Sequence, residues 1–220
     1  MTLSFAEENY LKAIYHLSGD GNEPVSTNAI AEVLNTKAAS VSDMLKKLSQ
    51  KGVINYQRYQ GVRISPTGAK AALMVIRKHR LWEVFLVEKL KFNWDEVHEV
   101  AEQLEHIKSP LLIKRLDEFL GFPKVDPHGD PIPDENGEIL VRPQIPLSEL
   151  PLHGAGSLAA VDDSSTVFLQ YLDKVGLYIG AKLEIVERVE FDGSMQLRVD
   201  DDRLLFITEQ AAKNIMITEL

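Results

Sequence analysis

Histidine and glutamate side chains recur at helical spacing between residues 79 and 106 of this 220-residue chain. On an α-helix each residue turns by about 100°, so four of these side chains fall within an arc of roughly 100° on one face: His98, Glu102, Glu105 and His106. Imidazole nitrogens and carboxylate oxygens are ligands of divalent cations. The pattern therefore predicts a metal centre on one face of a helix.

A second pair with the same chemistry lies one helix earlier. His79 and Glu83 are four residues apart, so their side chains are neighbours on a helix surface. Two antiparallel helices would bring this pair opposite the first set. A single Glu is ordinarily solvated and a lone His ordinarily belongs to the core or surface, but the joint spacing favours metal binding.

The segment upstream of this cluster has the pattern of a DNA-binding module. After an amphipathic helix over residues 5–18, two short helices are expected at residues 27–34 and 37–50, capped by Ser26 and Thr36. Residues 53–64 are typical of a β-hairpin that turns near Gln60 and Gly61. Together these elements predict a winged helix-turn-helix.

In that architecture the N-terminal end of the second helix enters the major groove, where small residues allow close approach and Ser or Lys meets base edges. Basic side chains of the hairpin hold phosphates. Asp43 is a mild counter-signal, because phosphates repel a carboxylate, although it can accept a hydrogen bond from cytosine. The predicted DNA-binding residues are Thr27, Lys37, Ala38, Ala39, Ser40, Ser42, Asp43, Lys47, Arg58 and Arg63.

The charge distribution agrees with a DNA-binding N-terminal module and a metal-binding remainder. The net charge is −9, yet residues 1–80 hold 11 Lys and Arg against 6 Asp and Glu, and residues 51–80 hold seven basic side chains and no acid. The remaining residues hold 13 basic against 27 acidic side chains. This asymmetry predicts a phosphate-facing N-terminal module joined to an acidic remainder that favours cations.

The rest of the chain predicts a mainly α protein with a small β domain. Helices are expected over residues 69–90, 93–107 and 110–120, followed by a segment (123–151) that holds seven of the ten prolines. Short strands from about residue 157 are typical of an SH3-like β-barrel. We therefore expect a winged helix-turn-helix domain (1–72), a helical domain (73–140), a proline-rich linker (141–156) and an SH3-like domain (157–220).

Composition narrows the functional classes. The chain has no cysteine, which excludes thiolate metal sites, iron–sulfur clusters and cysteine nucleophiles. It has no apolar run of 18 residues and no N-terminal export signal, so we expect a cytoplasmic protein without a membrane span. The common phosphate-loop, dinucleotide, zincin and nucleophile-elbow motifs do not occur, and neither an enzyme nor a small organic substrate is expected.

One further motif has two interpretations. Residues 128–133 read His-Gly-Asp-Pro-Ile-Pro, a turn followed by an extended step. His128 would be a further metal ligand, but a rigid connector leaving the helical domain is the favoured interpretation.

The chain resembles the diphtheria-toxin-repressor family of metal-dependent bacterial regulators, which includes the iron-dependent and manganese-transport regulators. The resemblance covers the whole chain and rests on residues 8–15, 41–42, 65–68, 77–81, 97–99, 105–106 and 128–133. It implies a homodimer through the helical domain, a winged helix in each subunit on a double-stranded DNA operator, and two metals per subunit. Carried over by position, the predicted ligands are His79, Glu83 and His98 at one site, and Asn9, Glu102, Glu105 and His106 at the other.

The chain departs from its relatives at three places. Glu102 stands where iron-type relatives have Cys, so the donors are oxygen and nitrogen only, and Mn²⁺ is favoured over Fe²⁺. Manganese-type relatives have Asp and Glu where Asn9 and Lys12 stand. Iron-type relatives add a Glu and a Gln from the third domain, where Asp162 or Asp163 is the candidate here.

These observations predict a metal-activated transcriptional repressor that controls manganese or iron uptake genes. Two alternatives remain at this point. One is a metal-dependent enzyme, such as a di-metal hydrolase built on the same His and Glu residues. The other is a winged-helix regulator that does not depend on metal.

Overall fold

The computed structural model describes residues 2–19, 21, 23–57, 60–140, 142–162 and 164–219. The chain divides into two compact units: residues 1–79, 102–115 and 133–139 form one, and residues 80–101, 116–132 and 140–220 form the other. Each unit has its own hydrophobic core. Among the described residues, no helix combines the length and apolar character needed to cross a membrane.

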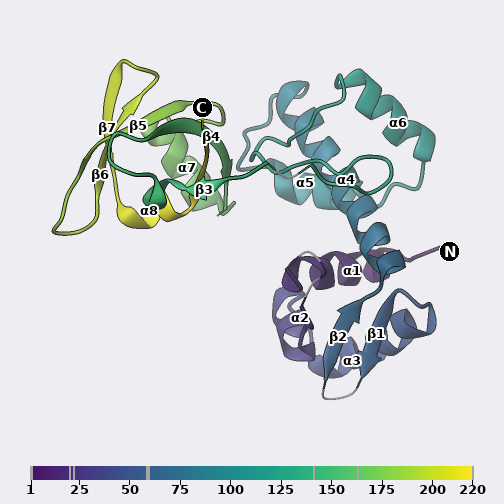
Figure 1. Cartoon of the computed structure of the whole chain (residues 1–220). Coiled ribbons are helices and arrows are strands. Elements are labelled where there is room, and N and C mark those ends of the chain that lie inside the picture. Colours follow the sequence, from purple (N-terminus) through teal and green to yellow (C-terminus); the bar gives the residue numbers. More distant parts are fainter. Residues whose placement is uncertain are drawn as a thin grey trace. The chain divides into compact units, whose positions relative to one another are not determined.

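The first unit begins with the expected winged helix (Figure 1). It contains α1 (Phe5–Leu17), α2 (Thr27–Val33), α3 (Ala38–Gln50), β1 (Ile54–Gln57) and β2 (Gly61–Ile64), with the two strands paired antiparallel. Ser26 caps α2 as expected, whereas the residue that caps α3 is Lys37 rather than Thr36, and its side chain makes no capping bond. Side chains of all three helices fill the core, among them Leu11, Ile30 and Leu45.

Three further helices carry the predicted metal ligands. They are α4 (Pro66–Glu88), α5 (Val97–Leu104) and α6 (Pro110–Phe119). α4 starts three residues earlier than expected, because Pro66 suits a first helical turn and Ser65 Oγ accepts a hydrogen bond from Gly68 N (3.1 Å). α5 is shorter than the expected helix over 93–107, since residues 94–96 form a turn before it.

The proline-rich segment is more ordered than a linker. Residues 126–130 form a tight turn in which Gly129 N donates to Asp126 O (3.1 Å). Further on lie β3 (Ile145–Pro146) and a 3-10 turn (Leu147–Glu149). Leu147 and Leu150 are buried in the core of the second unit. Residues 145–150, expected to be linker, therefore belong to the third domain, because their apolar side chains are buried in its core.

The third domain is the expected small β domain, with two α-helices that the sequence did not suggest. Its remaining elements are β4 (Ala155–Val161), α7 (Thr166–Val175), β5 (Lys182–Arg188), β6 (Met195–Val199), β7 (Arg203–Ile207), α8 (Glu209–Lys213) and β8 (Ile215–Glu219). The strands form an antiparallel sheet in the order β3-β8-β4-β5-β6-β7. α7 begins at the N-cap Ser165 and ends at Gly176, whose φ is 70°.

Candidate metal centres and nucleic-acid interface

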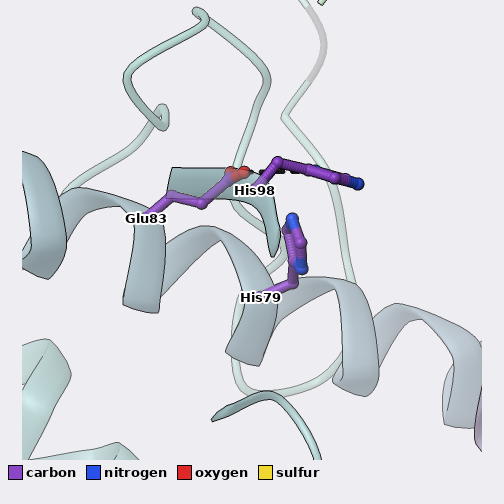
Figure 2. A group of neighbouring side chains, drawn as sticks. All are labelled: His79, Glu83 and His98. Carbon is purple, nitrogen blue, oxygen red and sulfur yellow. Dashed lines mark ion pairs between the residues drawn. The ribbon is translucent and has the colours of Figure 1, made fainter. Parts of the chain in front are cut away.

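His79, Glu83 and His98 come together as the sequence predicted. His79 and Glu83 lie one turn apart on α4, and both are buried. His98, at the start of α5, pairs with Glu83 across 3.6 Å (Nδ1 to Oε1), and Figure 2 shows the three side chains gathered over the helix. Each offers a ligand atom within 4.8 Å of the other two. We call this group, with the two residues added below, the α4 centre.

The structure adds two ligand candidates to the predicted set, of which Asp126 is new and His128 had been the less favoured interpretation of the turn. Asp126 and His128, in the turn of the proline-rich segment, lie beside Glu83, and these three residues also offer ligand atoms within 4.8 Å of one another. All three are buried. His128, interpreted from the sequence as part of a rigid connector, is therefore a candidate metal ligand as well.

A hydrogen bond determines which nitrogen of the His128 ring carries the hydrogen and which one faces Glu83. Its Nε2 lies 2.8 Å from the backbone carbonyl oxygen of Trp94, which can only accept, so Nε2 carries a hydrogen. In the neutral ring the lone pair then resides on Nδ1, the atom 3.9 Å from Glu83 Oε2. A carbonyl that holds one imidazole nitrogen while the other is left for a cation is the usual arrangement of a histidine ligand.

The electrostatics of the α4 centre also suit a divalent cation. Burial raises the pKa of Asp126 well above its ordinary value, and the neighbouring carboxylates of Asp130 and Glu83 raise it further. Arg80 opposes this effect, with Nε 3.5 Å from Asp126 Oδ2. Buried carboxylates with too little positive charge nearby are stabilised by a bound cation, so the residues present fit a metal.

The second predicted ligand set lies in the first unit, where α1 meets the end of α5. Glu105 is fully buried, and its Oε2 is 2.7 Å from His79 Nδ1. His106 Nδ1 is 2.7 Å from Glu8 Oε2. Glu102 and Glu105 both contact the ammonium of Lys12. We call Glu102, Glu105 and His106, together with Glu8, Asn9 and Lys12 of α1, the junction centre.

Two features of the junction centre bear on metal binding. Burial acts to raise the pKa of Glu105, but the hydrogen bond with His79 and the charge of Lys12 outweigh it, and the pKa is lowered. Asn9 Oδ1 is a buried atom for which the described residues provide no hydrogen-bond partner. The charged carboxylates and the amide oxygen are suitable metal donors, but the carboxylates of Glu102 and Glu105 already bind the ammonium of Lys12.

The predicted nucleic-acid interface is exposed at the start of α3. Lys37, Ala38, Ala39 and Ser40 are all exposed, as are Lys47 and Arg63. Ser42 Oγ donates to Ala38 O (3.0 Å) within the helix, and Thr27 is half-buried at the start of α2. Asp43 Oδ1 is 2.9 Å from Lys46 Nζ, so the carboxylate that counted against phosphate binding has its own counterion.

Some predicted residues do not join these groups. Asp162 is exposed, and its backbone N donates to Asn214 O (3.0 Å) at the end of β4. Asp163, the alternative third-domain ligand, lies outside the described residues, and so does Arg58 of the wing.

A winged helix joined to a helical domain with grouped His and Glu side chains defines a class of metal-dependent DNA-binding regulators, and comparison with known proteins agrees. Three family models match the chain. The N-terminal DNA-binding domain of iron-dependent repressors matches residues 2–62, their metal-binding and dimerisation domain matches residues 65–134, and the FeoA domain matches residues 145–219.

Individual relatives cover most of the chain. The iron-dependent repressor IdeR of Mycobacterium tuberculosis (strain ATCC 25618 / H37Rv) is 30% identical over 194 residues, which are 88% of this chain and 77% of that protein. A solved manganese-dependent transcriptional repressor in complex with manganese is 34% identical, with a TM-score of 0.85 over 97% of this chain and 100% of that one. The manganese regulator SloR is 36% identical, with a TM-score of 0.73 over the whole of both chains.

The chain therefore belongs to the iron-dependent repressor family, and it is a metal-dependent transcriptional repressor of that type. The family resemblance, the fold class and the general function predicted from the sequence are confirmed.

Proposed function

We propose that this protein is a homodimeric repressor that binds its operator when the α4 centre and the junction centre hold Mn²⁺. Fe²⁺ is the second candidate metal. The regulated genes are those of manganese or iron uptake, and the protein acts in the cytoplasm. The domain matches support DNA binding and dimerisation, and the relatives named above include both iron-dependent and manganese-dependent repressors.

The observation that carries the proposal is the setting of Glu83. This buried carboxylate belongs to two groups of potential ligands, one with His79 and His98 and one with Asp126 and His128. The chain has no cysteine, so every side chain of the centre offers oxygen or nitrogen. Such donors suit hard or borderline cations that accept six ligands, which favours Mn²⁺ and Fe²⁺.

The chain's own residues supply the connection to DNA binding. Glu8 and Lys12 lie one turn apart on α1, the first helix of the winged helix, and reach His106 and Glu105. His79 of α4 binds the same Glu105. The junction centre thus joins α1 to α4 and to the end of α5. A bound metal supplies positive charge to these carboxylates, and it favours the DNA-binding state only through a higher affinity for that state.

Operator binding with and without metal tests this proposal. Duplexes selected from a random library in the presence of Mn²⁺ are titrated with the protein, and binding is followed by fluorescence anisotropy. We expect Mn²⁺, and Fe²⁺ under anaerobic conditions, to strengthen binding, and Glu83→Gln to lower Mn²⁺ affinity by at least about tenfold. Glu88→Gln, an exposed glutamate on the same helix, is the matched control. Equal operator affinity after exhaustive chelation would contradict the proposal.

A further inference from the structure

The ammonium of Lys12 contacts both of the glutamate carboxylates that the sequence analysis assigns to the second metal site. Its Nζ lies 2.9 and 2.7 Å from the two carboxylate oxygens of Glu105 and also contacts Oε1 of Glu102. These partners follow Lys12 by 90 and 93 positions in the sequence. The contact is therefore a tertiary one, made where α1 meets the end of α5.

The burial of this group makes the contact different from a surface ion pair. The Lys12 side chain is 14% exposed and that of Glu105 is 0% exposed. Exposed ion pairs contribute little because water and salt screen them, but a buried carboxylate needs a specific positive partner. Lys12 provides that partner from the protein itself.

The Glu102 and Glu105 carboxylates cannot bind Lys12 and a divalent cation at the same time. His79 Nδ1 already binds Glu105 Oε2 at 2.7 Å, and His106 binds Glu8 through Nδ1 at 2.7 Å while its Nε2 lies 3.6 Å from Glu105 Oε1. A divalent cation held by the same oxygens would lie within a few ångströms of the Lys12 ammonium. Like charges at such distances repel strongly even at the effective dielectric of a protein, so the two cations exclude each other.

We infer that Lys12 is a tethered cation that competes with the metal for the junction centre. Its ammonium holds Glu102 and Glu105 when metal is scarce, and it must leave them before the junction centre binds a divalent cation. The junction centre then fills second, at a metal concentration above that which fills the α4 centre. Lys12 is in this view a positioning residue that sets the threshold of the sensor. The inference rests on the proposed metal activation.

Replacing Lys12 changes this competition in a direction that can be measured. Lys12→Gln removes the charge and keeps an NH₂ group that can donate to the carboxylates, whereas Lys12→Arg keeps the charge. Equilibrium dialysis against Mn²⁺, with free Mn²⁺ followed by electron paramagnetic resonance, gives the number of ions bound per subunit and the affinity of each step. We expect the second step to be at least about tenfold tighter in Lys12→Gln and unchanged in Lys12→Arg.

Lys51→Gln is the matched control, because Lys51 also pairs with a carboxylate of α1, that of Glu7, but outside the junction centre. Its binding curve is expected to follow that of the unaltered protein. Equal second-step affinity in Lys12→Gln and the unaltered protein would overturn the competition and leave the proposed function intact. Absence of Mn²⁺ binding by the unaltered protein and every variant would overturn both.

A measurement on the unaltered protein keeps the inference testable if Lys12→Gln does not fold. An amine-reactive reagent is applied at increasing Mn²⁺, and the modification of Lys12 is followed by mass spectrometry, with the exposed Lys46 as reference. We expect Lys12 to be protected without metal and to become reactive as the second equivalent of Mn²⁺ binds. Protection that does not change at saturating Mn²⁺ would contradict the proposed displacement.

Discussion

The imidazole of His128 donates from Nε2 to the backbone carbonyl of Trp94, 2.8 Å away, and the two rings stack with centroids 6.1 Å apart. The indole Nε1 of Trp94 in turn lies 3.0 Å from Asp173 Oδ2 on α7. Trp94 therefore touches a candidate ligand of the α4 centre on one side and a helix of the third domain on the other.

This contact predicts that Trp94 reports metal binding. A cation beside His128 changes the electrostatic field at the stacked indole, and paramagnetic Mn²⁺ quenches its fluorescence. The chain has two tryptophans, so the measurement is made in a Trp82→Phe background, where Trp94 is the only tryptophan. We expect Mn²⁺ to lower the emission, with a midpoint equal to that of the first binding step.

The matched variant is His128→Gln in the same background. Loss of one ligand is expected to weaken the first Mn²⁺ by roughly 10- to 100-fold and to shift the fluorescence midpoint equally. A quenching curve that does not change in His128→Gln would show that His128 takes no part in this centre.

A second prediction concerns Gly129, which allows the turn carrying His128 to lie against β4. Its φ is +89°, and a Cβ there would stand 2.0 Å from Ala159 O. The backbone N of Val161 donates to His128 O at 3.0 Å beside it. Gly129→Ala must separate these segments, so we expect lower thermal stability, by more than the roughly 1–2 kcal/mol of left-handed strain, and weaker Mn²⁺ binding.

Gly180→Ala separates strain from steric overlap. Gly180 has a similar φ of +96°, but an added Cβ would meet nothing within 4 Å. Gly180→Ala is expected to lower the stability only by the left-handed strain and to leave Mn²⁺ binding unchanged. Equal behaviour of the two variants in calorimetry and dialysis would show that the close approach at Gly129 is unimportant.

A third prediction concerns the exposed face of α3. If Lys47 contacts a phosphate, Lys47→Ala removes one such contact per subunit and two per dimer. The slope of log affinity against log salt should then fall in magnitude by about 2, and affinity should weaken for all sequences alike. Lys174→Ala, an exposed lysine on α7, is the control. Titrations at several salt concentrations provide the test, and an unchanged slope would remove Lys47 from the interface.

Helical spacing alone predicts that two residues of the α4 centre, His79 and Glu83, share one face of a helix. His79 and Glu83 are i and i+4 on a helix that forms as expected, so their common face could be derived from periodicity alone. Asp126 and His128 stand in a turn among prolines, where no periodicity relates them to α4. Their approach to Glu83 depends on the packing of that turn. The available signal was Gly129, since a glycine beside a histidine allows close backbone contact.

The sequence alone does not predict which charged side chains from distant parts of the chain come into contact. Lys12 could be compared with the acidic residue of manganese-type relatives, but its contact with Glu105 joins residues 93 positions apart. The sequence does not predict α7 for a different reason. Its capping residues, Ser165 and Gly176, are ordinary helix boundaries, but the strand-like spacing of the flanking segments favours β structure throughout this region.

The last prediction concerns Glu7, which links the start of α1 to the end of α3. Its carboxylate accepts from Ser4 N (2.7 Å) in a capping box and pairs with Lys51 Nζ (2.7 Å). Burial acts to raise the pKa of Glu7, but the bonds with Lys51 and Ser4 outweigh it, and the pKa lies below its ordinary value of 4.5. The charged form therefore stabilises the folded state.

The sign of the pH dependence follows from this lowered pKa. The stabilising contribution is fully present above pH 4.5 and is lost as the pH falls through the folded-state pKa. We expect Glu7→Gln to cost about 1 kcal/mol at neutral pH, and the difference from the unaltered protein to shrink below pH 4.5. Thermal unfolding by circular dichroism in the presence of a chelator measures this, with Glu32→Gln, an exposed carboxylate on α2, as control. A difference that stays constant or grows on acidification would mean that the charge of Glu7 does not stabilise the fold.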